Sequence, residues 1–149
     1  MNYVDKEIAF REIPDEITLA ISISGCKIHC PDCHSKYLWS NIGEELTEPI
    51  LSSIIEENNG ITCVCFMGGN YNEVVSFFKY VRHEYPNLKT AWYTGESEIA
   101  INDDLLTYFD YVKVGPYIKE RGGLDSKTTN QILYHIVNRK LENVNHLIH

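Results

Sequence analysis

Long apolar runs are missing from this sequence. None approaches the ~20 residues that a membrane-spanning helix needs. Acidic and basic side chains interrupt residues 1–16, whereas a secretory signal peptide has an uninterrupted apolar segment there. We therefore expect a cytoplasmic protein with no membrane partner.

Basic residues are also scarce: 13 Lys and Arg stand against 21 Asp and Glu, for a formal net charge of −8. Nucleic-acid binding depends largely on Lys and Arg displacing counterions from phosphates, so we expect no nucleic-acid partner. Linkers and internal repeats are absent as well. A length of 149 residues predicts one domain spanning 1–149, large enough for a core without disulfides.

The number of cysteines is odd, which argues against a disulfide framework in a cytoplasmic chain. Cys26, Cys30 and Cys33 lie within eight residues, and Cys63 and Cys65 lie two apart. Residues two apart on a strand face the same side, and cysteine often behaves as a small buried hydrophobe. We expect Cys63 and Cys65 to pack in the core.

Strands and helices alternate along most of the chain. Residues 17–24 alternate apolar and polar side chains, which is typical of a strand, and Thr47 is a candidate N-cap for a helix. The order implies an α/β fold with mostly parallel strands and helical crossovers. We expect strands over 17–24, 61–67, 88–93 and 110–115, and helices over 47–58, 73–84 and 103–109. For 131–148 we favour a C-terminal β-hairpin, with a helix as the alternative.

Four features follow the predicted parallel strands, where the ligand crevice of such sheets lies. We expect them to meet at one rim of the sheet. They are the Cys26–Cys33 loop, Gly68-Gly69-Asn70, Tyr93-Thr94-Gly95 and Val114-Gly115-Pro116.

The C-x3-C-x2-C loop offers three soft ligands in one turn. Structural zinc sites and cubane iron–sulfur clusters normally take four protein ligands, so three thiolates favour a cluster with one iron open to a substrate. His29 or His34 could complete a zinc site, which is one alternative. A thiol–disulfide motif at Cys30–Cys33, or unrelated loop cysteines, are two others.

The loop resembles a known family. Three parts of it are similar to the cluster loop of radical S-adenosylmethionine proteins: Ser24-Gly25-Cys26, the segment Cys30-Pro31-Asp32-Cys33-His34-Ser35-Lys36, and Trp39. The short chain is most similar to the activating protein of the anaerobic (class III) ribonucleoside-triphosphate reductase. Three further segments resemble motifs of that family: Met67-Gly68-Gly69, Gly115-Pro116-Tyr117 and Thr128-Thr129-Asn130-Gln131.

The resemblance implies a single radical S-adenosylmethionine domain folded as a partial, open TIM-like barrel. Cys26, Cys30 and Cys33 would bind a [4Fe–4S] cluster whose fourth iron chelates S-adenosylmethionine. Reductive cleavage of that cofactor would lead to a glycyl radical on the large reductase subunit. The electron would come from a donor such as a flavodoxin-like protein. The family implies no catalytic side chain beyond the cluster.

Five further residues are implied as cofactor-binding: Asp32, His34, Gly68, Gly69 and Asn70. The backbone of Asp32 and His34 would lie along the adenine. Gly68, Gly69 and Asn70 would contact the methionine amino group, although the family has an acidic residue where Asn70 stands. An ordinary Gly-Gly turn after a strand is the alternative. The loop Tyr117–Asn130 is expected to dock the partner protein or to gate the site.

Overall fold

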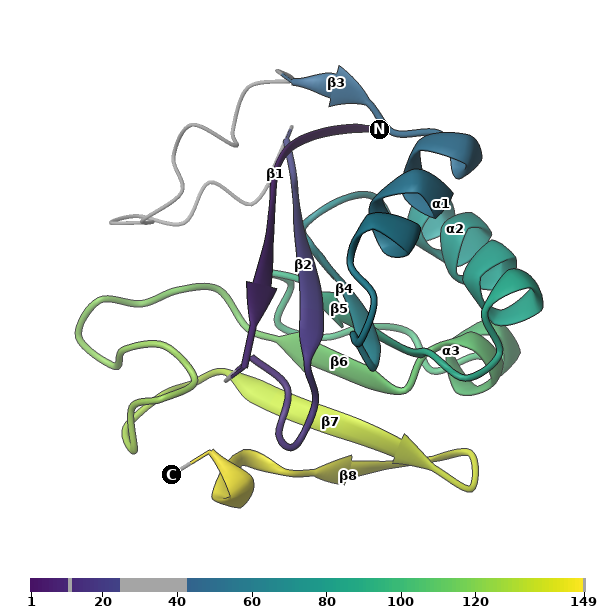
Figure 1. The fold of residues 1–149 in the computed structure, drawn as a ribbon. Helices are drawn as coiled ribbons and strands as arrows, with labels where there is room; N and C mark the ends of the chain where they lie inside the picture. Colours follow the sequence, from purple (N-terminus) through teal and green to yellow (C-terminus); the bar gives the residue numbers. More distant parts are fainter. Residues whose placement is uncertain (11, 25–42, 149) are drawn as a thin grey trace.

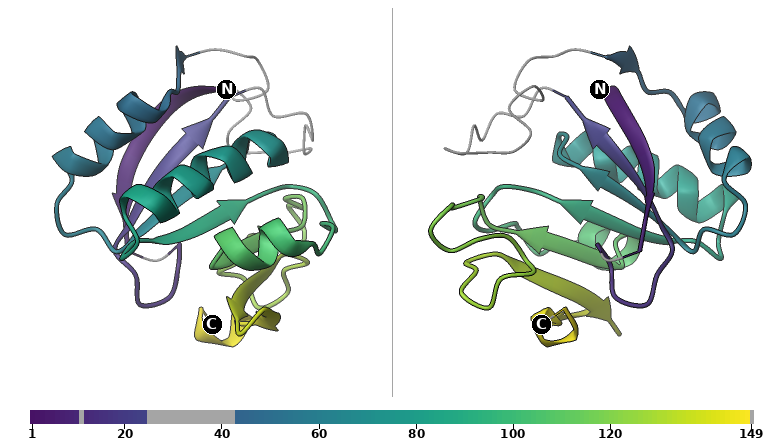
Figure 2. Two further views of the ribbon diagram at one scale, coloured as in Figure 1. Left: turned by 90° about the vertical axis from the view of Figure 1, so that its right-hand side faces the viewer. Right: turned by 60° about the vertical axis from the view of Figure 1, so that its left-hand side comes forward.

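The computed structural model describes residues 1–10, 12–24 and 43–148, which form one eight-stranded sheet in the order β3-β1-β2-β4-β5-β6-β7-β8 (Figure 1). The α-helices cover one face of the sheet (Figure 2). None of the helices in the described ranges is long and apolar enough to cross a membrane. The strands are β1 (Asn2–Ala9), β2 (Thr18–Ile23), β3 (Glu44–Glu45), β4 (Cys63–Met67), β5 (Lys89–Tyr93), β6 (Tyr111–Val114), β7 (Ile132–Val137) and β8 (Lys140–Asn143). The helices are α1 (Glu48–Glu57), α2 (Tyr71–Glu84), α3 (Asp103–Tyr108) and the short 3₁₀ helix η2 (Asn145–Leu147).

The middle of the sheet is parallel, as the sequence predicts. β2, β4, β5 and β6 pair side by side in one direction. α1 precedes β4, α2 joins β4 to β5, and α3 joins β5 to β6. Thr47 caps α1, as expected, by accepting a hydrogen bond from the Ile50 N–H. The helix predicted over 73–84 begins earlier, at Tyr71, because Asn70 caps it.

Both flanks of the sheet are antiparallel, so the expectation of mostly parallel strands is wrong. Among the described strands, three of the seven pairings are parallel and four are antiparallel. The α/β class and the open sheet are confirmed, and the likeness to a TIM barrel stays a prediction. The sequence analysis missed β1. Charged side chains at Asp5, Lys6 and Glu7 hide its period, because this strand lies near the sheet edge with those side chains exposed.

The C-terminal β-hairpin is confirmed. β7 pairs antiparallel with β8 from Tyr134 to Val137, and Asn138 and Arg139 form the turn with φ of 51° and 63°. Two consecutive residues with positive φ are typical of a type I′ hairpin turn. The Arg139 guanidinium forms an ion pair with Asp103 at the start of α3, which ties the hairpin tip to the helix layer.

The side chains of β4 alternate between two apolar clusters on opposite faces of the sheet. Val64 and Phe66 face the helices, where the Phe66 ring stacks on Phe78 at 5.2 Å between centroids. Cys63 and Cys65 face the other side and pack in a second cluster with Ile13. Ile13, from the loop between β1 and β2, is fully buried, so this loop covers part of the second face.

Candidate cofactor rim

The carboxyl ends of the parallel strands form a continuous rim. The Gly68 N–H donates to the Tyr93 carbonyl at 2.9 Å, which joins the end of β4 to the end of β5. The Thr94 N–H donates to the Lys113 carbonyl at 2.9 Å, and the Gly115 N–H donates to the Glu96 carbonyl at 2.7 Å. Three of the four predicted features therefore lie side by side, as expected.

The fourth feature, the Cys26–Cys33 loop, follows β2. Ile23, which ends β2, and Ser24 are the last described residues before it. The loop's predicted ligands and adenine-lining residues fall in 25–42 and lie outside the described residues, so their roles stay predictions: Cys26, Cys30, Asp32, Cys33 and His34. Within 1–10, 12–24 and 43–148, the structure groups no three His, Cys, Asp or Glu side chains that could hold a metal ion.

The Gly68-Gly69 turn brings backbone close to the end of β2. Both glycines have φ of +97°, a conformation that L side chains rarely adopt. A methyl group at Gly68 would lie 3.2 Å from the Ile23 carbonyl oxygen, and one at Gly69 would lie 3.3 Å from Cγ2 of Val74. Glycine is therefore favoured here by conformation, and a methyl group would also require its neighbours to shift by a few tenths of an ångström. A turn without side chains leaves its peptide groups able to approach a ligand, which fits the predicted contact with S-adenosylmethionine.

Asn70 has a structural role that the sequence analysis did not assign. Its side-chain oxygen accepts a hydrogen bond from the Asn72 N–H at 3.0 Å and caps the first turn of α2. An amide oxygen has a second lone pair, so the predicted cofactor contact is compatible with the cap. The cap alone explains why an asparagine follows the glycine turn.

Trp92 is a residue of this rim that the sequence analysis missed. Its indole Nε1–H donates to the Gly68 carbonyl at 2.8 Å, and its side chain is almost fully buried. The ring lies in an aromatic cluster with Tyr71 and Phe109, at centroid distances of 5.7 and 6.1 Å. A tryptophan inside a strand is typical of a core residue, so no sequence signal marks this bond.

The two remaining cysteines are core residues, as predicted. Cys63 and Cys65 are fully buried in the second cluster, and both are free thiols. Burial raises the pKa of each thiol above its ordinary value, since it disfavours the thiolate. Thiolates are the form that binds metals and reacts, so this environment keeps both groups inert.

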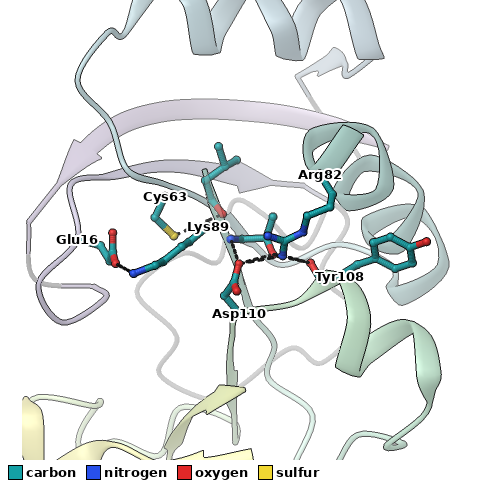
Figure 3. A network of polar contacts seen from close by, with 8 residues as sticks. Glu16, Cys63, Arg82, Lys89, Tyr108 and Asp110 are labelled. Carbon is teal, nitrogen blue, oxygen red and sulfur yellow. Dashed lines mark hydrogen bonds and ion pairs between the residues drawn. The ribbon is translucent and has the colours of Figure 1, made fainter. Parts of the chain in front are cut away.

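Charged groups gather at the opposite edge of the sheet, where the parallel strands begin (Figure 3). Glu16, which is buried, forms an ion pair with Lys89 and accepts a hydrogen bond from the Thr62 hydroxyl. Nearby, Arg82 of α2 pairs with Asp110 at 2.9 Å. The bond to Glu16 raises the pKa of Lys89. These groups are paired with one another, and they tie the starts of β2, β4, β5 and β6.

A hollow of about 320 Å³ lies at this same edge, between the carboxyl ends of α1 and α2. Asn58, Gly60, Tyr85 and Asn87 are among the residues that line it. It is separated from the predicted rim by the length of the parallel strands.

The loop Tyr117–Asn130 is folded on itself and attached to the rim. The hydroxyl of Thr129 donates to the Gly122 carbonyl at 3.1 Å, and the side-chain amide of Asn130 donates to the Pro116 carbonyl at 3.1 Å. The side-chain amide of Gln131 donates to the Gly115 carbonyl at 3.3 Å. The loop therefore projects from the rim on a fixed base and carries exposed basic side chains at Lys119, Arg121 and Lys127.

Comparison with known proteins gives one match. The family model described as a 4Fe-4S single cluster domain matches residues 17–136. These include the three-cysteine loop, all the parallel strands, the loop Tyr117–Asn130 and β7 except for Val137. No curated protein and no solved structure matches the chain. The match covers more than half of the sequence and agrees with the cluster favoured from the cysteine spacing. The chain therefore belongs to the family of 4Fe-4S single cluster domains.

Proposed function

We propose that this protein is a radical S-adenosylmethionine activase that generates a glycyl radical on the large subunit of the anaerobic ribonucleoside-triphosphate reductase. One observation carries the proposal: the cysteines of the C-x3-C-x2-C loop lie within the segment that the 4Fe-4S family covers. Three thiolates leave one iron of a cubane without a protein ligand, and that iron can take a substrate. Cys26, Cys30 and Cys33 are the proposed ligands.

The described rim supports a cofactor site beside that loop. Ile23 ends β2 one residue before the last described residue, Ser24, and the Gly68-Gly69 turn lies against Ile23. In this proposal the turn binds the amino-acid part of S-adenosylmethionine through backbone groups, while Asp32 and His34 line the adenine. Together, the cluster and S-adenosylmethionine would supply the chemistry: an electron, reductive cleavage of the cofactor and abstraction of a hydrogen atom from a glycine of the partner.

The partner assignment is part of the same proposal. The sheet is open, so a protein segment can approach the rim without entering a closed barrel. The loop Tyr117–Asn130 is the proposed docking segment, because it projects from the rim and exposes three basic side chains against two acidic ones, Glu120 and Asp125, in an acidic protein. A cytoplasmic, flavodoxin-like protein would donate the electron.

The test is anaerobic reconstitution followed by electron paramagnetic resonance. Reduced protein is mixed with S-adenosylmethionine and the candidate reductase, and we expect a glycyl-radical doublet together with 5′-deoxyadenosine and methionine. Cleavage of S-adenosylmethionine without a radical on the reductase would refute the partner and favour another radical S-adenosylmethionine activase or maturase. No cleavage by protein with a full cluster and a strong reductant would refute the proposed function.

A further inference from the structure

We propose that Trp92 is a positioning residue for the cofactor: its indole N–H holds the Gly68-Gly69 turn in the conformation that binds S-adenosylmethionine. The inference rests on the proposed function, since it concerns the same turn. It assigns a role to a buried side chain that the proposed function leaves without one.

The turn needs a restraint from outside. Glycine has more accessible backbone conformations than any other residue, and two in succession give a flexible segment. Ordering such a segment on binding costs affinity, whereas a turn that is already fixed avoids that cost. A site that contacts its ligand through glycine backbone therefore depends on neighbours that fix the glycines.

Two consecutive residues of β5 provide the restraint. The Tyr93 carbonyl accepts the Gly68 N–H at 2.9 Å, and the Trp92 indole donates to the Gly68 carbonyl at 2.8 Å. Gly68 is therefore held at both of its peptide groups. The first bond continues the β4–β5 ladder and is available to any residue at 93, but the second requires an indole at 92.

Trp92 is itself held rigidly. It is 2% exposed, and its ring packs against Tyr71 in the first turn of α2 and against Phe109, which follows α3. Tyr71 in turn donates to Asn102, the N-cap of α3. The indole N–H is thus aimed at the turn by packing from two helices, so its direction does not depend on the ligand.

The experiment compares Trp92→Phe with Phe109→Leu in the cluster-loaded protein. Trp92→Phe keeps an aromatic ring but removes the donor. Phe109→Leu disturbs the same aromatic cluster without touching the turn. Affinity for S-adenosylmethionine is measured from the change that it causes in the spectrum of the reduced cluster, and exchange of backbone amides in the peptide 66–72 is followed by mass spectrometry.

We expect Trp92→Phe to weaken binding by roughly three- to tenfold, the effect of about one hydrogen bond, and to speed exchange in the turn. KM for S-adenosylmethionine should rise by a similar factor while kcat at saturation changes little. Phe109→Leu should lower the melting temperature and weaken binding less than Trp92→Phe does, because Tyr71 still packs against the indole and the N–H donor is kept. A second test replaces Trp92 by β-(3-benzothienyl)alanine, an analogue with sulfur in place of the indole N–H, in a Trp39→Phe protein that has no other tryptophan. This replacement should weaken S-adenosylmethionine binding relative to the Trp39→Phe protein by the same factor.

Equal affinity in wild-type and Trp92→Phe protein would overturn the inference and leave the proposed function intact. So would equal losses in Trp92→Phe and Phe109→Leu, because these would show a general packing effect. A wild-type protein with a full cluster that binds no S-adenosylmethionine would refute the proposed function, and the inference with it.

Discussion

Gly68 and Gly60 form a matched pair for testing the cofactor rim. Their φ angles are nearly equal, at +97° and +95°, so alanine at either position meets the same unfavourable backbone conformation. A methyl group at Gly68 would lie 3.2 Å from the Ile23 carbonyl oxygen, whereas one at Gly60 would have no neighbour within 4 Å. Gly60 lies in the loop between α1 and β4, at the edge of the sheet opposite the proposed site.

The backbone cost is common to both variants. An L residue at positive φ costs roughly 1–2 kcal/mol, so each variant should unfold at a temperature lower by roughly 3–8 °C for a chain of this size. Gly68→Ala should lose slightly more stability, because the Ile23 carbonyl must move by a few tenths of an ångström. Only Gly68→Ala should also weaken S-adenosylmethionine binding, since its methyl group stands in the turn that approaches the cofactor.

The assay pairs thermal unfolding with equilibrium binding of S-adenosylmethionine to cluster-loaded protein. The expected pattern is two destabilised variants of which one, Gly60→Ala, binds with wild-type affinity. Wild-type affinity in Gly68→Ala would refute the assignment of the turn to the cofactor. A loss of affinity in Gly60→Ala equal to that in Gly68→Ala would show that binding responds to stability alone.

Three other predictions concern separate parts of the molecule. Asn70→Ala should lower the free energy of unfolding by about 1 kcal/mol in urea titrations, because α2 loses its cap, whereas Asn70→Asp should retain it. The bond to Glu16 raises the pKa of Lys89 above its ordinary 10.5. The stabilisation from this ion pair is therefore complete below about pH 10.5 and is lost as the pH rises through the raised pKa. The difference in unfolding free energy between wild type and Lys89→Met should accordingly shrink above about pH 10.5. Serine at Cys26, Cys30 or Cys33 should abolish cluster assembly, measured as iron and sulfide per chain, while Cys63→Ser and Cys65→Ser should retain about four of each.

Local patterns in the sequence predicted most of the parallel half of the fold. The alternation over 17–24 and the helical spacing after Thr47 each leave a period in the sequence, whereas the continuous apolar run before Gly68 reflects a strand buried on both faces. The three-cysteine spacing likewise predicted an iron–sulfur chain, because ligands within one loop lie near one another in any fold. The N-cap at Asn70 is also a local feature, but the sequence analysis missed it because it interpreted Gly68-Gly69-Asn70 only as a cofactor-binding segment.

What the sequence by itself determined, then, is the set of elements in the parallel core, the hairpin and the type of metal centre. The tertiary structure decided the rest, because it depends on residues far apart in the chain. β1 is a strand only through pairing with β2 and β3, and its charged, exposed positions carry no apolar period. The bond from Trp92 to Gly68 joins residues 24 apart, and the pair Glu16–Lys89 joins residues 73 apart. Such contacts form only when the strands align, and no single segment contains the information that specifies them.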